Sequence, residues 1–174
     1  MEMNGGPTSL SVCVRDRIAC VRVTGRANFT SSVDFRKLLE QLQEDGCTEI
    51  VLDLTECTLM DSTFLGVLAG AAMKCDGPQC NGQRCLIELF HPSERVLESL
   101  ANLDVLKLFS ILDDAPELGA FRRVDEGETT RIELNRTCFE AHKTLMNTSP
   151  ENVRRFKDAT DFFEKNLRDE EGKK

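Results

Sequence analysis

The chain is poor in the features that mark several functional classes. Its 174 residues include two His and no Trp or Tyr, so all ten aromatic side chains are Phe. A net charge of −8 offers no basic face, and we expect no direct nucleic-acid partner. No apolar run approaches the ~20 residues of a membrane-spanning helix, so we expect no membrane insertion. The N-terminal residues MEMNGGPTSLS lack the basic start and apolar centre of a signal peptide, which favours a cytoplasmic protein.

Motifs of conventional catalysis are also missing. No G-x-S-x-G nucleophile elbow, G-x-G-x-x-G loop or phosphate-binding P-loop is present. His91 and His142 lie far apart in sequence, and we assign both to helix-cap or surface roles. Gly66 and Gly70 fall inside a predicted helix, where glycine permits close packing. We therefore expect no enzymatic activity and no cofactor.

The eight cysteines fit a reducing compartment. Cys13, Cys20 and Cys57 sit in or beside apolar runs, where a free thiol behaves as a small apolar side chain. Cys75, Cys80 and Cys85 follow one another at intervals wider than the C-x-x-C pair that structural zinc sites favour, and a fourth ligand is missing. We predict no metal site, and any other role of these three residues stays open.

The most informative stretch is residues 50–73, IVLDLTECTLMDSTFLGVLAGAAM. It begins as a buried strand, breaks at residues 58–60, and restarts as a helix at Asp61 and Ser62, which are both good N-caps. A hydroxyl at a helix N-terminus that follows a buried strand lies where an open α/β sheet presents its functional surface. Ser62 is therefore the first candidate for a functional residue.

The flanking segments predict a compact α/β domain over residues 8–113. Residues 10–14 and 18–23 form a predicted antiparallel hairpin, and a helix capped from residues 30–32 has an apolar stripe from Phe35 to Leu42. Another strand and helix follow, and a short strand lies within residues 106–112. Because right-handed crossovers place successive strands in parallel, we predict a mixed sheet with helices packed against it.

The C-terminal third has a different composition. Residues 114–128 are acidic and contain Pro and Gly, so we predict a linker. Residues 129–168 carry two amphipathic patterns with their own N-terminal signals and predict a helical hairpin, although its first residues could begin as a strand. Its apolar stripes can pack on each other, on the sheet domain or on a second copy, which leaves a homodimer open. We predict a disordered tail over residues 169–174.

The order of elements and two motifs resemble the STAS domain family, and within it the bacterial anti-sigma factor antagonists. The motifs are Val51-Leu52-Asp53-Leu54 and Met60-Asp61-Ser62-Thr63-Phe64-Leu65-Gly66-Val67-Leu68, and residues 102–111 are similar to the family's last helix and strand. The resemblance covers residues 8–113 and implies a STAS-like mixed β-sheet. The α-helical extension at the C-terminus is unexplained by it.

The resemblance implies a role in transcription regulation by partner switching. The unphosphorylated antagonist would bind an anti-sigma factor that is also a serine kinase, and phosphorylation at Ser62 would release it. Phosphate adds about −1.5 to −2 charges, here one residue from Asp61 and inside an interface fitted to a neutral hydroxyl. The implied partner-binding residues lie around two helix starts: Asn28, Phe29, Asp61, Ser62, Thr63, Phe64 and Gly66.

Two positions depart from the family pattern, and they leave alternatives open. Phe64 replaces a glycine, and would reshape partner contact if exposed but only pack if buried. Asn28 stands where the family has an aspartate, after Arg26, which adds a positive charge. A second hypothesis is an unphosphorylated STAS scaffold or subunit of a stressosome-like or transport-associated complex. Packing of the C-terminal helices over Ser62 would favour this second hypothesis, because a kinase must reach the hydroxyl.

Overall fold

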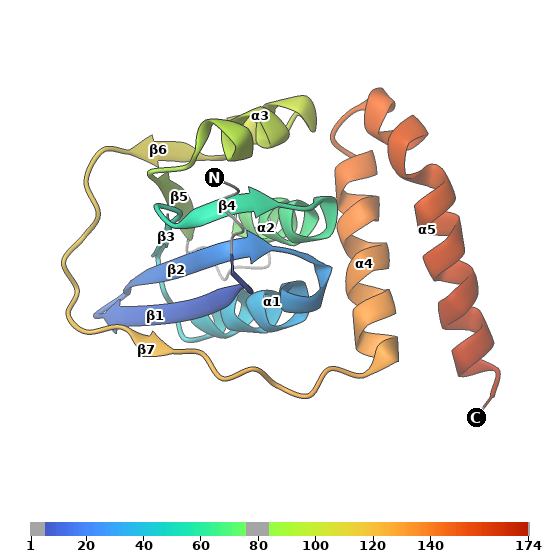
Figure 1. The fold of residues 1–174 in the computed structure, drawn as a ribbon, viewed down its shortest axis with the longest axis horizontal. Coiled ribbons are helices and arrows are strands. Elements are labelled where there is room, and N and C mark those ends of the chain that lie inside the picture. The colour runs from blue at the N-terminus through green and yellow to red at the C-terminus, as the bar shows by residue number, and fades with distance from the viewer. Residues whose placement is uncertain (1–5, 76–83, 174) are drawn as a thin grey trace.

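A mixed sheet of seven strands forms the body of the molecule (Figure 1). The structure is a computed structural model and describes residues 6–75 and 84–173. Along the chain the elements are β1 (Ser9–Arg15), β2 (Ile18–Ala27), α1 (Phe29–Glu44), β3 (Glu49–Asp53), β4 (Cys57–Met60), α2 (Ser62–Cys75), β5 (Leu86–Phe90), α3 (Glu94–Asn102), the 3-10 helix η1 (Leu106–Leu108), β6 (Ser110–Leu112), β7 (Arg122–Arg123), α4 (Arg131–Met146) and α5 (Pro150–Glu171). The predicted α/β fold with a C-terminal helical extension is confirmed.

The strand order is β6-β5-β3-β2-β1-β7, and β4 pairs with β2 beside this path. β1 and β2 form the predicted antiparallel hairpin, while β2, β3, β5 and β6 pair in parallel. Strand residues such as Val21, Leu52 and Leu89 share one apolar core with Phe35 of α1 and Leu68 of α2. We call residues 9–112, from β1 to β6, the sheet domain.

Two strands were missed by sequence reasoning. β4 covers the segment in which the sequence pattern breaks, and it pairs with the end of β2 at Gly25, Arg26 and Ala27 through an irregular register. β7 lies inside the segment predicted as a linker and pairs with β1. Both strands are short and lack a clear alternation, so their pairing depends on the neighbouring strand and not on local propensity.

Helix α1 starts earlier than predicted. Its N-cap is Asn28, whose side-chain oxygen accepts hydrogen bonds from the backbone N–H groups of Thr30 and Ser31. The cap was expected at residues 30–32, which instead lie in the first turn. Asn and Ser are comparably good N-caps, so capping preference alone does not choose between residue 28 and residues 30–32. Because β2 ends at Ala27, the helix starts directly after it and Asn28 becomes the cap.

Helices α4 and α5 form the predicted helical hairpin, and we use this name for residues 131–171. Both starts carry the predicted signals: Thr130 and Glu133 make a capping box, and Ser149 caps α5 before Pro150. The segment beginning at residue 129 does not form a strand. Helix α5 continues to Glu171, into the segment predicted as a disordered tail, and Arg131 and Arg136 of α4 form ion pairs with Glu170 and Glu171. 

The hairpin packs on itself and on the sheet domain. Figure 1 shows α4 between the domain and α5, and α4 contacts both α2 and α1. The start of α5 is tied to the end of α3, where the Asn152 side-chain N–H₂ group donates to the Leu103 carbonyl at 2.9 Å. The apolar stripes of the hairpin therefore pack both on each other and on the sheet domain, which are two of the three predicted alternatives. A homodimer through these helices stays a prediction.

Candidate functional site

Asp61 caps α2 and joins its start to that of α1. One carboxylate oxygen accepts a hydrogen bond from the backbone N–H of Phe64 at 2.9 Å, and the other accepts from the backbone N–H of Phe29 at 2.7 Å. The Asp61 N–H in turn donates to the Ala27 carbonyl at the end of β2. Of the two candidate caps, Asp61 therefore does the capping. The Ser62 hydroxyl is left for another contact.

That contact comes from α4. Ser62 Oγ lies 3.1 Å from Nε2 of His142, a residue 80 positions later in the chain. His142 is only 6% exposed, and its ring stacks on Phe156 of α5 with the centroids 5.0 Å apart. Burial lowers the pKa of His142 below its ordinary value, and the nearby Asp61 carboxylate opposes this only in part. The imidazole is therefore neutral near pH 7.

Two further contacts join α2 to α4. The Thr63 hydroxyl donates to the Cys138 sulfur at 3.8 Å, and Gly66 lies against the backbone of Ala141. A Cβ built on Gly66 would lie 2.5 Å from the Ala141 carbonyl oxygen, so only glycine permits this approach. We call the contact of Ser62, Thr63 and Gly66 with α4 the seam.

Phe64 does not belong to the surface. It is fully buried, and its ring stacks on Phe35 of α1 with the centroids 4.2 Å apart. The prediction that Phe64 contacts a partner is wrong, and its second interpretation, core packing, holds. A phenyl ring fits here because the start of α1 and the start of α2 lie side by side over the sheet.

The other predicted site residues gather around these two helix starts. Asn28 is half-buried as the cap of α1, and Phe29 is 47% exposed. Asp61 and Ser62 are half-buried, whereas Thr63 and Gly66 are buried. The structure therefore brings the predicted residues together but covers the α2 part of their surface with α4.

Sequence reasoning missed the α4 side of the site. We assigned His142 to a cap or surface role, which is wrong because the ring is buried between α2 and α5. One signal could have found it. Cys138, Ala141, His142 and Leu145 follow the i, i+3, i+4, i+7 spacing of one helix face, and all four are buried. His91 is exposed, as expected.

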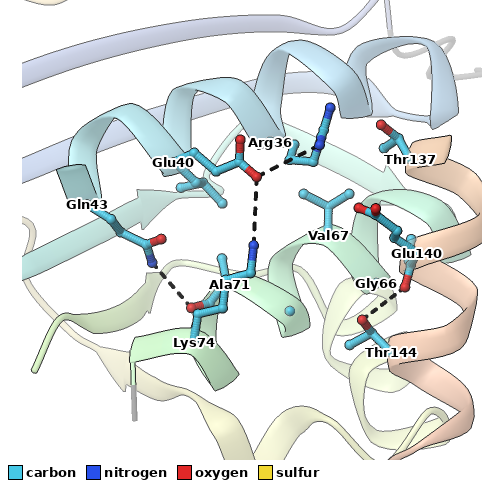
Figure 2. Close-up of a pocket in the computed structure, with 13 residues that line it drawn as sticks. Arg36, Glu40, Gln43, Gly66, Val67, Ala71, Lys74, Thr137, Glu140 and Thr144 are labelled. Atoms are coloured by element: carbon cyan, nitrogen blue, oxygen red, sulfur yellow. Dashed lines mark hydrogen bonds and ion pairs between the residues drawn. The ribbon is translucent and has the colours of Figure 1, made fainter. Parts of the chain in front are cut away.

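A pocket of about 190 Å³ adjoins the seam between α1, α2 and α4 (Figure 2). Glu40 on its α1 side pairs with Arg36 at 3.9 Å and with Lys74 at 3.7 Å. Arg36 Nε and the Thr137 hydroxyl are buried at this pocket without a hydrogen-bond partner. The pocket shows that α4 does not fill the space that it covers.

No metal centre is formed by the part of the chain that the structure describes, since no group of three or more His, Cys, Asp or Glu side chains comes together there. Cys85 is buried beside β5. Cys80 and the side chain of Cys75 lie outside the described residues, as does the loop predicted over residues 76–83. None of the described helices is long and apolar enough to cross a membrane.

Comparison with known proteins bears on the sheet domain. The model of the STAS domain family matches residues 9–117. The structure of the unphosphorylated anti-sigma factor antagonist SpoIIAA is similar, with a TM-score of 0.51 and 16% identity over 60% of this chain and 89% of that one. An anti-sigma factor antagonist from Mycobacterium paratuberculosis gives 0.53 and 16% over 62% and 87%, and the protein TM1081 gives 0.50 and 19% over 59% and 78%. At these identities the likeness shows a shared fold, and the family match ends before α4.

Proposed function

The chain belongs to the STAS domain family, and from this membership we propose that it is an anti-sigma factor antagonist in a partner-switching pathway. In this proposal it is a cytoplasmic binding protein with no reaction of its own. Its partner is an anti-sigma factor with serine kinase activity. The partner binds the surface around the starts of α1 and α2, and phosphorylation of Ser62 releases it.

The observation that carries the proposal is the state of the Ser62 hydroxyl. Asp61 caps α2, so the hydroxyl one residue later is not consumed by the helix. A phosphate at the first residue of a helix is tolerated by the helix dipole, which favours negative charge at that end. It would nevertheless disrupt an interface built around a neutral hydroxyl, because the phosphate and Asp61 repel each other and lose their hydration.

One observation favours the second candidate function, a scaffold or subunit that is not phosphorylated. With α4 docked, half-buried Ser62 already has its Oγ hydrogen-bonded to a buried imidazole, and α4 lies beside the hydroxyl that a kinase would have to approach. In this case the hairpin would cover the surface around Ser62 permanently. The two candidates differ in whether the hydroxyl ever accepts phosphate.

The test is phosphate incorporation into the full chain by each anti-sigma-type serine kinase encoded in the source genome. We expect one phosphate on the wild-type chain, located at Ser62 by mass spectrometry, and none on Ser62→Ala. Ser93→Ala is the matched control, since Ser93 is another serine at a helix start but lies outside the site. It should accept phosphate like the wild type.

Two results would contradict the proposal. The first is full incorporation into Ser62→Ala, which would place the modification elsewhere. The second is no incorporation into any variant by any of these kinases, which would leave the scaffold as the function. Binding gives a parallel readout: Ser62→Asp should bind the kinase at least about tenfold more weakly than the wild type, by analogy with the repulsion described above.

A further inference from the structure

Helix α4 occupies the surface that the proposed function assigns to a partner. Its contacts fall on the first turns of α2: His142 on Ser62, Cys138 on Thr63, and Ala141 on Gly66. These are neighbouring positions on one face of α2 and neighbouring positions on one face of α4. The covered surface is therefore one that fits a helix.

The close approach at Gly66 gives this surface its shape. The Ala141 backbone lies where a side chain at position 66 would stand, so the two helices meet at their main chains. One turn later, at Gly70, the helices have separated: a Cβ there would make only ordinary contact, 3.6 Å from the Thr144 hydroxyl. Gly66 is the tight point of the seam and Gly70 is not.

In the described part of the chain, the buried polar atoms that have no hydrogen-bond partner belong to the hairpin or face it. Within residues 6–75 and 84–173, buried side-chain N and O atoms without a hydrogen-bond partner occur at Arg36, Asn135, Thr137, His142, Asn152 and Glu170. All except Arg36 belong to the hairpin, and Arg36 faces α4 across the pocket in Figure 2. A buried polar atom without a partner destabilises the state that buries it, and water would satisfy it after release.

We propose that the hairpin is a displaceable cover: α4 binds in cis to the surface of Ser62, Thr63 and Gly66, and a helix of the partner replaces it there. This inference rests on the proposed function, which makes the same surface the partner site. In the closed state Ser62 is protected from the kinase. In the open state Ser62 is accessible and the unpaired groups of α4 are hydrated.

The hairpin stays tethered when it opens. On one side residues 113–130 connect it to the sheet domain, and β7 within them pairs with β1. Such a tether keeps the hairpin at a high effective concentration near its surface, so an isolated helix in solution competes poorly with it. A partner must therefore add contacts outside the seam, and exposed Phe29 beside Asp61 is placed to provide one.

Buried thiols measure the opening without any partner. Cys138 in the seam and Cys57 in β4 are both 2% exposed, so N-ethylmaleimide reaches each only after an opening, the first of the seam and the second of the sheet domain. Gly66→Ala should increase the Cys138 labelling rate at least tenfold, because the methyl group meets the Ala141 backbone. It should leave the Cys57 rate within twofold of the wild type.

Gly70→Ala is the matched control, with the same chemical change one turn along the same helix. It should leave both labelling rates within twofold of the wild type, since its Cβ would make only ordinary van der Waals contact with the Thr144 side chain. Equal Cys138 rates in Gly66→Ala, Gly70→Ala and the wild type would overturn the inference. So would a parallel rise of the Cys57 rate in Gly66→Ala, because the whole domain would then be opening.

The partner arm uses Ala141→Leu, which loosens the seam from the α4 side and leaves the surface of α2 unchanged. With the purified kinase, Ser62 should be phosphorylated at least tenfold faster in this variant than in the wild type. Ala101→Leu, the same change at an exposed position of α3, should match the wild type. Equal rates in all three would overturn the cover. Absence of phosphate in all three would contradict the proposed function, while the thiol rates still decide the inference.

Discussion

The sheet domain and the seam bury side chains of different kinds. Between the sheet and its helices lie Leu, Val, Ile and Phe side chains such as Leu52, Leu89 and Phe35, all fully buried. Between α2 and α4 lie an imidazole, a thiol, hydroxyl groups and a glycine, beside Ala141 and Leu145, which join the apolar core, and α4 carries unpaired polar atoms at Asn135, Thr137 and His142. The first kind of interior favours one cooperative unit, and the second favours an interface that opens separately.

The largest expected effect comes from truncating a buried leucine to alanine in each of the two regions. Leu52 in β3 and Leu145 in α4 are both fully buried. Leu52→Ala should lower the free energy of unfolding of the sheet domain by about 2–5 kcal/mol. Leu145→Ala should instead increase opening of the hairpin and leave the domain's unfolding in place.

A denaturant titration, monitored through maleimide labelling of Cys57 and Cys138, tests these two variants. In the wild type and in Leu145→Ala, Cys138 should become reactive at lower denaturant than Cys57. If both variants shift a single transition shared by the two thiols, the domain and the hairpin are one cooperative unit and the comparison fails.

The next effect comes from closing the seam covalently. The Thr63 hydroxyl is 3.8 Å from the Cys138 sulfur, so Thr63→Cys should place two thiols within reach of a disulfide. The bond would link α2 to α4 and stabilise the closed state by about 2–4 kcal/mol. Oxidised protein should resist phosphorylation of Ser62, and dithiothreitol should restore it.

The wild-type chain treated with the same oxidant is the control, and its phosphorylation should be unchanged. Peptide mapping shows whether the intended disulfide forms. If it does not form under mild oxidation, α4 does not lie where the seam places it. If it forms and phosphorylation continues at the same rate, the closed state does not protect Ser62.

The smallest expected effect is a dependence of hairpin docking on pH. Burial lowers the pKa of His142 below its ordinary value of 6.5, whereas a released hairpin would restore that value. The open state therefore binds more protons below pH 6.5, so docking is complete above this pH and weakens as the pH falls. The ratio of Cys138 to Cys57 labelling should rise by up to about fivefold between pH 6.5 and 5.5.

The groups around His142 support this assignment. Ser62 and the two phenyl rings of Phe156 and Phe163 are uncharged, and only the Asp61 carboxylate opposes the shift. His142→Gln keeps a hydrogen-bonding side chain that does not titrate, and its ratio should be constant over this range. The same pH dependence in that variant would place the titrating group elsewhere.

Local signals account for what the sequence could predict. The apolar run of residues 50–54 predicts β3, and the capping residues Asp61, Thr130 and Ser149 predict the starts of α2, α4 and α5. Each of these features is decided by residues within one or two turns. For this reason the site serine was found before its surroundings were known.

The remaining features depend on residues that are distant in sequence. The contact of Ser62 with His142 spans 80 positions, and although helical spacing places His142 on the buried face of α4, nothing local indicates which surface that face meets. The burial of Phe64 depends on Phe35 of another helix, so its pattern allowed either interpretation. β4 and β7 are too short to be recognised without the strands that they pair with. Tertiary packing decides all of these features.

In our proposal the hairpin opens from an otherwise intact sheet domain. The most direct measurement is the ratio of the Cys138 to the Cys57 labelling rate in the unmodified full chain at pH 7 without denaturant. We expect a ratio above about ten, since undocking should need less free energy than unfolding the domain. A ratio near one would contradict it, because the seam would then open only when the whole molecule unfolds.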